Sequence, residues 1–312
     1  MSRRELIDAE VRVPLDQLLE ALPGGFNAIP DIVQRRATVE AMLSGIEVPD
    51  NPRVTKEDRT IPGPDGEPDI SVRIYRPAQE TEKGIYFIHG GGMILGSVEG
   101  EDPVATKICD EVGAVVVSVE YRLSPENPHP APAEDCYAGL KWMAAYAQSL
   151  KINQLGIYGG SAGGGLTIAV ALMARDRGGP ALDFMMPIYP MIDDTNTTAS
   201  TQEIVDIGIW DRAGNIQAWE WYLGGKPADQ YAAPTRAEDL AGLPPAFIDV
   251  GTVDMFRDED IAFAQRLMQS GVPTELHIHP GSYHAAETFA TDAALSQRIW
   301  SLRIDALKRF LS

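Results

Sequence analysis

Residues 155–163 read LGIYGGSAG, and this stretch decides the fold. An apolar run over 155–158 is followed at once by the pattern G-x-S-x-G over 159–163, and a helical stretch begins at Gly163. In this pattern the serine stands on a sharp turn between a strand and a helix, where only small neighbours fit. All four residues that flank Ser161 are glycine or alanine. The sequence therefore predicts a buried strand that presents Ser161 as a nucleophile.

Similar apolar runs recur along the chain on both sides of this stretch. Most have little polar alternation, which is typical of parallel strands covered on both faces. They cover residues 85–88, 114–119, 184–189, 246–250 and 275–278, and an earlier pair of extended segments covers 54–61 and 70–75. Helical stretches lie between them, at residues 102–112, 133–149, 163–177, 258–270 and 295–311. This alternation predicts an α/β fold with a mostly parallel, eight-stranded central sheet and helices on both faces.

One connection is too long for a simple crossover. More than fifty residues separate the runs that end at 189 and start at 246, and the middle of this connection, 211–223, is helical and rich in tryptophan. Long connections usually carry a function, such as a lid. Together with the helical stretches 9–22 and 32–44, this insertion is expected to form a helical cap over the site. The expected division is N-terminal cap helices over 1–48, core over 49–192, cap insertion over 193–230 and core over 231–312.

A serine hydroxyl needs a general base at neutral pH, and the base needs an orienting acid. His284 follows the last expected strand and is the last of the five histidines, as the chain order Ser…Asp…His requires. His284 is therefore the expected base. The other histidines are expected to be loop or strand residues with structural roles: His89, His129, His277 and His279.

The acid should follow the strand expected over 246–250, and Asp254 has that place. Asp249 lies inside the strand and is expected to point into the packing. Asp258 is expected to cap the next helix. Asp254 is therefore the expected acid, and the alternatives, which follow an earlier strand, are Asp193 and Asp194.

A glycine-rich loop, His89-Gly90-Gly91-Gly92, follows another buried strand. Acyl transfer needs N–H donors at the point where the tetrahedral oxyanion forms. Glycines let backbone amides approach that point without a side chain in the way. The amides of Gly91, Gly92 and Ala162, with Gly90 as a further candidate, are expected to form an oxyanion hole.

The composition excludes several classes of function. The chain has 312 residues, 44% of them apolar, and a net charge of −19. Nucleic acids and anionic membranes would repel such a protein, so neither nucleic-acid binding nor stable membrane association is expected. Cys109 and Cys136 are too few for a disulfide framework and are expected to be buried or half-buried free thiols. The first 25 residues lack the apolar core of a signal peptide or membrane span, which favours a cytoplasmic location.

Nearly the whole chain resembles the hormone-sensitive-lipase-like (family IV) bacterial esterases of the α/β-hydrolase superfamily. The motifs that carry the resemblance are residues 89–92, 121–126, 130–135, 243–246, 254–259 and 283–284. The resemblance implies a serine carboxylesterase that cleaves short- to medium-chain, small-molecule esters without a cofactor or metal. It also implies a cap built from the N-terminal helices and the long insertion. Homodimers paired through the last strand are a further expectation.

The chain departs from this family beside the nucleophile. The family motif usually reads Gly-Asp-Ser-Ala-Gly-Gly, whereas Gly160 stands here in place of the aspartate. That aspartate is not a triad member, so hydrolysis is expected to survive. Its absence bears on the rigidity and charge beside Ser161, and so on the pH profile or the substrate range.

Two other functions remain open from the sequence. The first is a non-catalytic ligand-binding protein on this fold, since fold does not fix function. Related receptors lose the base, whereas this chain keeps His284. The second is a hydrolase of amides or lactones, because a triad permits both and specificity lies in the pockets.

Overall fold

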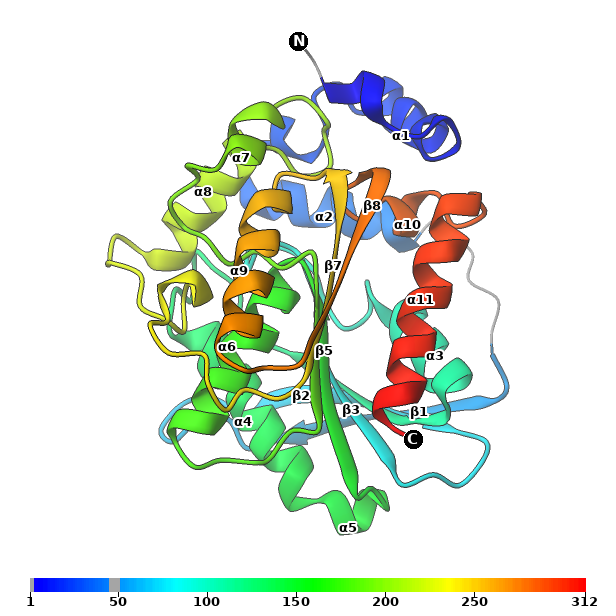
Figure 1. Cartoon of the computed structure of the whole chain (residues 1–312), viewed down its shortest axis with the longest axis vertical. Coiled ribbons are helices and arrows are strands. Elements are labelled where there is room, and N and C mark those ends of the chain that lie inside the picture. Colours follow the sequence, from blue (N-terminus) through cyan, green and yellow to red (C-terminus); the bar gives the residue numbers. More distant parts are fainter. Residues whose placement is uncertain (1–2, 45–50) are drawn as a thin grey trace.

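The strands form one eight-stranded sheet in the order β1-β2-β4-β3-β5-β6-β7-β8 (Figure 1). The computed structural model describes residues 3–44 and 51–312. The strands are β1 (Val54–Ile61), β2 (Ile70–Pro77), β3 (Lys83–Ile88), β4 (Val115–Glu120), β5 (Gln154–Gly160), β6 (Phe184–Ile188), β7 (Ala246–Val253) and β8 (Thr274–Tyr283). The β1–β2 and β2–β4 pairs are antiparallel, and the pairs from β4 through β8 are parallel. The predicted mostly parallel α/β sheet is confirmed.

The composition of the strands follows their place in the sheet. β4 reads Val-Val-Val-Ser-Val-Glu, and only its last residue is partly exposed. Such β-branched runs suit a central strand covered on both faces. The edge strand β1 instead carries a row of exposed polar and charged residues between buried Val54 and Ile61. Charged side chains on an edge strand oppose pairing with another chain, so β1 is protected against edge-to-edge association.

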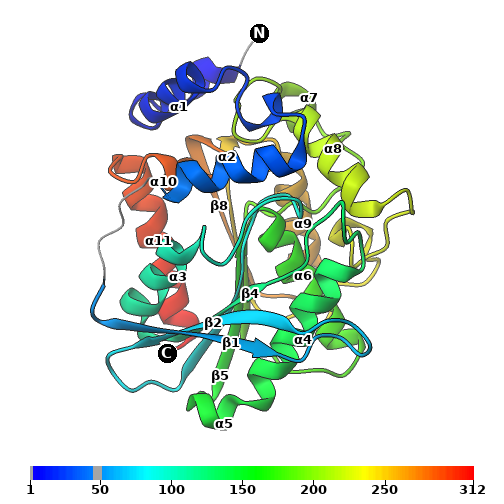
Figure 2. The same ribbon diagram turned by 180° about the vertical axis from the view of Figure 1, so that it is seen from behind.

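Helices cover both faces of the sheet and create two cores (Figures 1 and 2). The helices on one face are α4 (Ala131–Ala145), α6 (Ala162–Asp176) and α9 (Arg257–Gln269), and those on the other are α3 (Asp102–Ile108) and α11 (Ala294–Phe310). The larger core lies under α4, α6 and α9. The smaller core packs side chains of α3 and α11 against Ile85, Phe87 and Tyr158 of the sheet.

Two predicted helices differ from the structure at their ends. The helix predicted over 102–112 ends as α3 at Ile108, and the chain continues as a π-helical turn, Cys109–Gly113. The helix predicted over 133–149 is divided into α4 and α5 (Ala147–Leu150). Gly113 has a φ of +69°, a conformation that suits glycine, and it is the last residue of this π-helical turn. Cys109 and Cys136 are both buried and free, as expected.

A third group of helices lies beyond the carboxyl ends of the parallel strands (Figures 1 and 2). They are α1 (Ala9–Ala21), α2 (Ile32–Ser44), α7 (Ala199–Glu203), α8 (Arg212–Leu223) and α10 (Ala286–Phe289). The N-terminal segment and the long insertion contact each other, because Phe26 N donates to Gly208 O and Arg35 Nη2 donates to Gln217 Oε1. The expected boundary between 48 and 49 lies outside the described residues.

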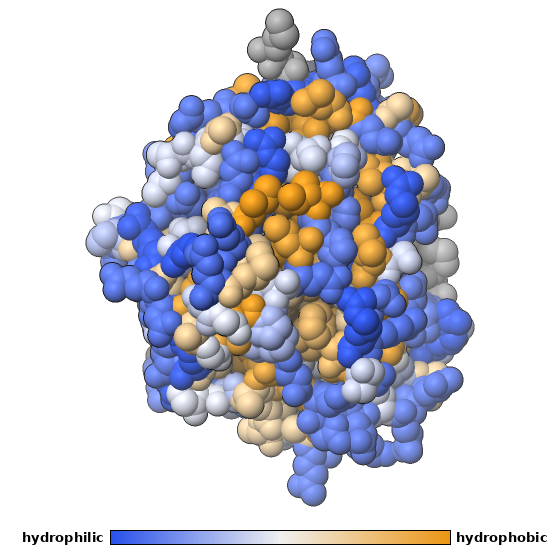
Figure 3. Space-filling view, in the orientation of Figure 1, coloured by the Kyte–Doolittle hydropathy of each residue, from blue (hydrophilic) through white to orange (hydrophobic). Residues whose placement is uncertain are grey.

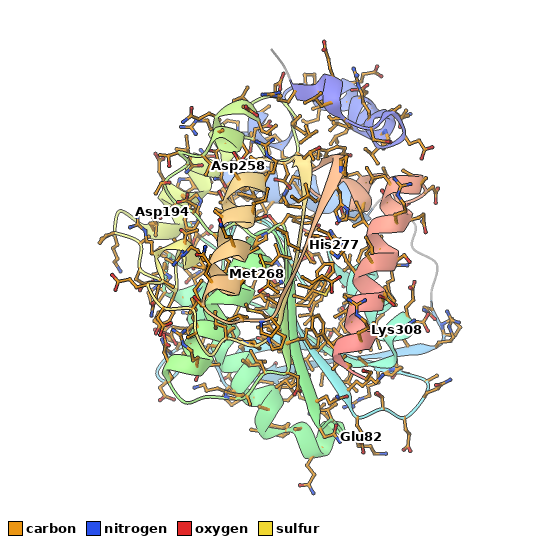
Figure 4. All side chains as sticks on the ribbon, viewed as in Figure 1. Glu82, Asp194, Asp258, Met268, His277 and Lys308 are labelled. Carbon is orange, nitrogen blue, oxygen red and sulfur yellow. The ribbon has the colours of Figure 1, made fainter. Side chains whose placement is uncertain are left out.

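The surface of the face shown in Figure 3 is largely hydrophilic, with apolar residues gathered near its centre. Met268 on α9, Ile278 on β8 and Leu302 on α11 are large apolar side chains exposed to solvent. Figure 4 labels Met268 and His277 on this face. Within residues 3–44 and 51–312, no helix is both long and apolar enough to cross a membrane.

Candidate active site

Ser161 stands on the turn between β5 and α6, as the sequence predicts. Its φ is +57°, a conformation that is uncommon for a residue with a side chain and is found at strained functional turns. The turn is tight because glycines let three backbone segments meet. A Cβ on Gly159 would overlap the Gly163 carbonyl, and a Cβ on Gly163 would overlap the Ile88 carbonyl. Gly159 and Gly163 are therefore a steric requirement of the turn.

Ser161, His284 and Asp254 form one chain of hydrogen bonds. His284 Nε2 lies 2.9 Å from Ser161 Oγ, and His284 Nδ1 lies 2.8 Å from Asp254 Oδ2. The geometry fits an Nδ1–H that donates to the carboxylate and an Nε2 that accepts from the serine hydroxyl. The second oxygen of Asp254 accepts from Phe256 N at 3.0 Å. The structure thus brings together the three residues that the sequence singles out.

The imidazole of His284 is held by rings as well as by hydrogen bonds. The ring of Tyr189 meets it edge-on at 4.7 Å, and the ring of Phe256 does so at 5.1 Å. All three residues come from loops that leave neighbouring strands at their carboxyl ends. Packing of this kind restricts the ring to one orientation, which a general base needs.

The other acids considered from the sequence bind elsewhere. Asp194 accepts two hydrogen bonds of 2.7 Å from Arg236. Asp193 accepts from the backbone and hydroxyl of Thr195. Asp249 is buried as expected and binds Arg303. These contacts leave Asp254 as the acid bonded to His284.

The expectation that Asp258 caps the next helix is wrong. α9 begins at Arg257 with Phe256 in the capping position, so Asp258 lies inside the first turn. Its Oδ2 accepts from Ser200 N at 2.8 Å, at the start of α7. The carboxylate therefore links α9 to the insertion, a contact between distant segments that local sequence cannot reveal.

The remaining histidines lie outside this chain of hydrogen bonds. His89 stacks on Tyr121 at 4.1 Å, and its Nδ1 lies 2.8 Å from Gly90 O. Burial lowers the pKa of His89 to about 4, so the ring is neutral and supports the glycine loop. His277 pairs with Glu275, and His279 pairs with Asp249.

The glycine loop brings backbone amides beside Ser161. Gly91 and Gly92 have φ angles of +108° and +64°, and a Cβ on either would overlap a neighbour: the Leu95 carbonyl or the Trp210 ring. In the part of the chain that the structure describes, no acceptor is bonded to the N–H groups of Gly91, Gly92 or Ala162. These three N–H groups therefore remain without an acceptor among the described residues.

Gly90 differs from the other candidates for the oxyanion hole. Its N–H donates to Glu101 Oε1 at 2.7 Å, so this amide is already bonded. Glu101 is the residue before α3, and its side chain makes no cap for that helix. Gly90 therefore lies in the loop as expected, while its amide holds the loop to Glu101.

A cavity of about 340 Å³ opens onto Ser161 and His284. The N-terminal segment, the glycine loop, the insertion and α10 give it an apolar wall, which we call the cap wall: Phe26, Leu95, Ile209, Trp210 and Phe289. The core supplies a wall of aromatic and charged residues, which we call the core wall: Glu101, Tyr158, Tyr189, Glu287, Trp300 and Arg303. The sequence reasoning missed the charged residues of the core wall.

Burial changes the pKa values of the carboxyl groups in and behind the core wall. Burial raises the pKa of Glu101 to about 7, against the opposing effect of the Gly90 N–H, and the nearby Glu287 raises it further. Arg303 and His279 together lower the pKa of Asp249, although burial acts in the opposite direction. At neutral pH, Asp249 is therefore ionised, whereas Glu101 titrates.

Known proteins resemble this chain over most of its length. Residues 85–288 match the family described as alpha/beta hydrolase fold. The carboxylesterase NlhH of Mycobacterium tuberculosis is 34% identical over 307 residues, which cover 95% of each chain. An arylesterase of Saccharolobus solfataricus is 33% identical over 249 residues, covering 76% of this chain and 79% of its own. The solved structure of a bacterial heroin esterase covers 100% of both chains with a TM-score of 0.92 and 35% identity.

Proposed function

The chain belongs to the alpha/beta hydrolase fold family, among the hormone-sensitive-lipase-like (family IV) bacterial esterases, and on this premise we propose that Ser161, His284 and Asp254 hydrolyse carboxylic esters. The observation that carries the proposal is the 2.9 Å separation of His284 Nε2 and Ser161 Oγ. The names of its relatives, carboxylesterase, arylesterase and heroin esterase, support an ester substrate.

The first half of the reaction forms an acyl-enzyme. Ser161 Oγ attacks the ester carbonyl carbon while His284 Nε2 takes the hydroxyl proton. Asp254 holds the imidazole orientation and stabilises the imidazolium. The N–H groups of Gly91, Gly92 and Ala162 bind the oxyanion of the tetrahedral intermediate. Collapse of this intermediate breaks the bond to the alkoxy oxygen, which takes the proton from His284 and leaves as the alcohol.

The second half of the reaction frees the enzyme. Water attacks the acyl carbon of the acyl-enzyme, and His284 takes a proton from that water. The same three amides bind the second oxyanion. When the bond to Ser161 Oγ breaks, His284 returns the proton to the serine and the carboxylic acid leaves. These steps need no cofactor.

The size of the cavity supports short to medium acyl chains. The cavity of about 340 Å³ lies at the small end of the range typical of ligand pockets, roughly 300 to 1,000 Å³. The cap wall offers apolar contact to an acyl or alkoxy group. We propose that the N-terminal helices and residues 193–230 act together as this cap.

The test is hydrolysis of p-nitrophenyl esters from acetate to palmitate by the wild type and by Ser161→Ala. We expect activity that peaks at short or medium chains in the wild type and is lost in the variant. A matched lactone and anilide would show whether these bonds are also cleaved. Esterase activity retained by a folded Ser161→Ala protein would overturn the assignment of the nucleophile.

We also propose that the protein is cytoplasmic. We further propose that it forms a homodimer paired through β8. β8 contacts only β7 in the described sheet, so its other edge is free to pair. Exposed Met268, Ile278 and Leu302 lie on α9, β8 and α11 and offer apolar surface around that edge. Figure 3 shows apolar residues near the centre of this face. Light scattering at micromolar concentration should give twice the chain mass; a monomer mass would refute the dimer.

A further inference from the structure

The two walls of the catalytic cavity differ in chemistry. The cap wall, defined above, carries apolar side chains alone. The core wall combines two carboxylates, one guanidinium and three aromatic rings around the same space. The proposed hydrolysis gives these groups supporting contacts only: Glu101 holds the Gly90 amide, and Glu287 accepts from Tyr189, which packs on His284. Among the described residues, these contacts leave the second oxygen of each glutamate unused.

The guanidinium of the core wall already has its counter-ion. Arg303 is 1% exposed and donates to both oxygens of Asp249, at 2.7 and 3.1 Å. Its ring neighbours are Tyr189 and Trp300, at 5.2 and 5.4 Å. A bidentate bond to a buried carboxylate neutralises an arginine and fixes its position. The charge of Arg303 is therefore already neutralised by Asp249.

The two carboxylates that line the cavity, those of Glu101 and Glu287, are additional to the Arg303–Asp249 pair. Glu287 is 2% exposed, and its Oε1 accepts from Arg303 at 2.6 Å and from Tyr189 Oη at 2.7 Å. Glu101 Oε1 accepts from Gly90 N. In the described part of the chain, the Oε2 atom of each glutamate accepts no hydrogen bond, although both residues line the cavity.

The charges near the cavity therefore do not balance. Glu101, Glu287 and Asp249 stand against Arg303, which leaves two negative charges unmatched when Glu101 is ionised. Lys107 also borders the cavity, but its amino group pairs with Glu111 one turn along the chain. Unmatched carboxylates in a partly desolvated site favour a cationic ligand.

On the basis of the proposed esterase function, we propose that the core wall is a subsite for a positively charged group, a quaternary or protonated amine, of the ester substrate. Carboxylate oxygens would supply the counter-charge. The ring of Tyr158 would supply a cation–π contact. The rings of Tyr189 and Trp300 already lie beside Arg303, and the amino group of Lys107 lies 5.6 Å from the Trp300 ring. Gly160 leaves open space beside Ser161, since a Cβ there would meet only the Tyr189 ring, at 3.4 Å or more.

The ionisation of Glu101 gives the subsite a pH dependence. Burial and the carboxylate of Glu287 raise the pKa of Glu101 to about 7. The groups that face Glu101 are Gly90 N, Glu287 and the phenols of Tyr121 and Tyr158. A bound cation stabilises the ionised form of the carboxyl, so binding releases a proton. Affinity for the cation should therefore rise as the pH increases through 7.

The first experiment compares esters of equal shape and different charge. Acetylcholine is paired with 3,3-dimethylbutyl acetate, and the ethyl ester of betaine with ethyl 3,3-dimethylbutanoate. One pair carries the cation in the alcohol and the other in the acyl group, so either orientation across Ser161 is covered. The ammonium group also makes the ester carbonyl more reactive, so each kcat/KM is divided by the rate constant for hydroxide hydrolysis of the same ester. We expect this corrected kcat/KM to favour the cationic member of at least one pair by about tenfold. Equal or lower values for both cationic esters would overturn the proposal.

The second experiment removes the charge at single positions. Glu101→Gln keeps a carbonyl oxygen for the Gly90 N–H but loses the charge, and Glu287→Gln tests the second carboxylate. The matched control is Glu99→Gln, two residues away, with a side chain that is 73% exposed and bound to Arg73. We expect the cationic preference to fall severalfold in Glu101→Gln and to persist in Glu99→Gln. An unchanged preference in a folded Glu101→Gln protein would contradict the proposal.

A binding measurement separates the subsite from the esterase function. Calorimetry with Ser161→Ala compares choline with 3,3-dimethylbutan-1-ol, its neutral analogue in shape. The subsite predicts saturable binding of the cation, tighter at pH 8 than at pH 6, and weaker binding of the neutral alcohol. Hydrolysis without cation binding would refute the proposed subsite and leave the proposed esterase function supported. Cation binding by a protein that hydrolyses no ester would refute the esterase function and support the subsite.

Discussion

Asp254 and Asp194 follow different strands, and their contacts distinguish them. Asp254 is fully buried and bonded to His284, whereas Asp194 is bonded to Arg236, whose side chain is partly exposed. We expect Asp254→Asn to lower kcat by about 10⁴-fold, because the amide favours the wrong tautomer of the base. Steady-state kinetics on p-nitrophenyl acetate gives the measurement.

Asp194→Asn is the control for this change. The pair that it breaks lies near the surface, where one ion pair contributes about 0 to 1 kcal/mol of stability, so kcat should stay near the wild-type value. The opposite result, a damaging Asp194→Asn and a mild Asp254→Asn, would identify Asp194 as the acid.

Asp260 is a second residue whose environment leads to a specific prediction, on the pH dependence of stability. It is fully buried on α9, and neither carboxyl oxygen has a hydrogen-bond partner among the described residues. Burial raises its pKa well above the usual value, and the nearby Glu259, Asp254 and Asp249 raise it further. The folded protein therefore holds this proton at a pH where the unfolded chain has lost it.

The sign of the resulting pH dependence follows from that proton. A folded state that binds the proton more tightly loses stability as the pH rises above the unfolded pKa, by up to about 1.4 kcal/mol per pH unit. We expect Asp260→Asn to remove this loss. Its free energy of unfolding relative to the wild type should rise steadily from pH 5 to pH 8 in urea titrations.

The matched control for this prediction is Asp292→Asn, which removes the charge of an exposed aspartate. Its stability relative to the wild type should not depend on pH. Parallel pH profiles of the wild type and Asp260→Asn would show that Asp260 is ionised and paired in the folded protein.

At the scale of elements, the insertion and the glycine loop meet at one contact. A Cβ on Gly92 would overlap the ring of Trp210, which comes from the loop before α8. Gly92→Ala should therefore displace the loop and its N–H groups. Loss of one oxyanion donor lowers kcat by about 100- to 1,000-fold, and we expect a loss of that order for p-nitrophenyl acetate.

Gly178→Ala is the control for the backbone effect. Gly178 has a similar φ of +61°, but no atom lies within 4 Å of a Cβ built there. Its alanine variant should lose some stability and keep kcat. Equal effects of the two variants on kcat would mean that the contact with Trp210 does not position the loop.

The sequence predicts the elements that have strong periodicity or a motif. Strands β3 to β8 follow from apolar runs and helix α6 follows from G-x-S-x-G, and the order along the chain selects Asp254 and His284. α10 is missed because its four residues, Ala286–Phe289, are too few to show a helical period. The end of α3 at Ile108 is missed because a π-helical turn keeps the same apolar pattern.

The core wall could not be predicted from the sequence, for a different reason. Glu101, Glu287 and Arg303 come from separate elements and are 16 or more residues apart. Each is read from its local sequence as an ordinary surface charge. Their common environment arises only when α3, α10 and α11 meet beside β5. Long-range contacts of this kind leave no local pattern.

At the scale of the whole molecule, a net charge of −19 surrounds the cavity with negative potential. Such a field attracts cations and is screened by salt. We expect kcat/KM for a cationic ester to fall as NaCl rises from about 0.01 M to about 0.1 M, since the Debye length shrinks from roughly 30 Å to 10 Å. The neutral ester of the same shape is the control and should change little. An equal response of both esters would exclude steering by charge.

The hydrogen bond between Ser161 and His284 joins residues that are 123 positions apart in the chain. Translation therefore produces the nucleophile long before its base. A chain that is released early, at a premature stop codon between these positions, contains Ser161 without the imidazole that activates it. We therefore expect such truncated chains to be inert toward esters, because they lack the imidazole that we propose as the base.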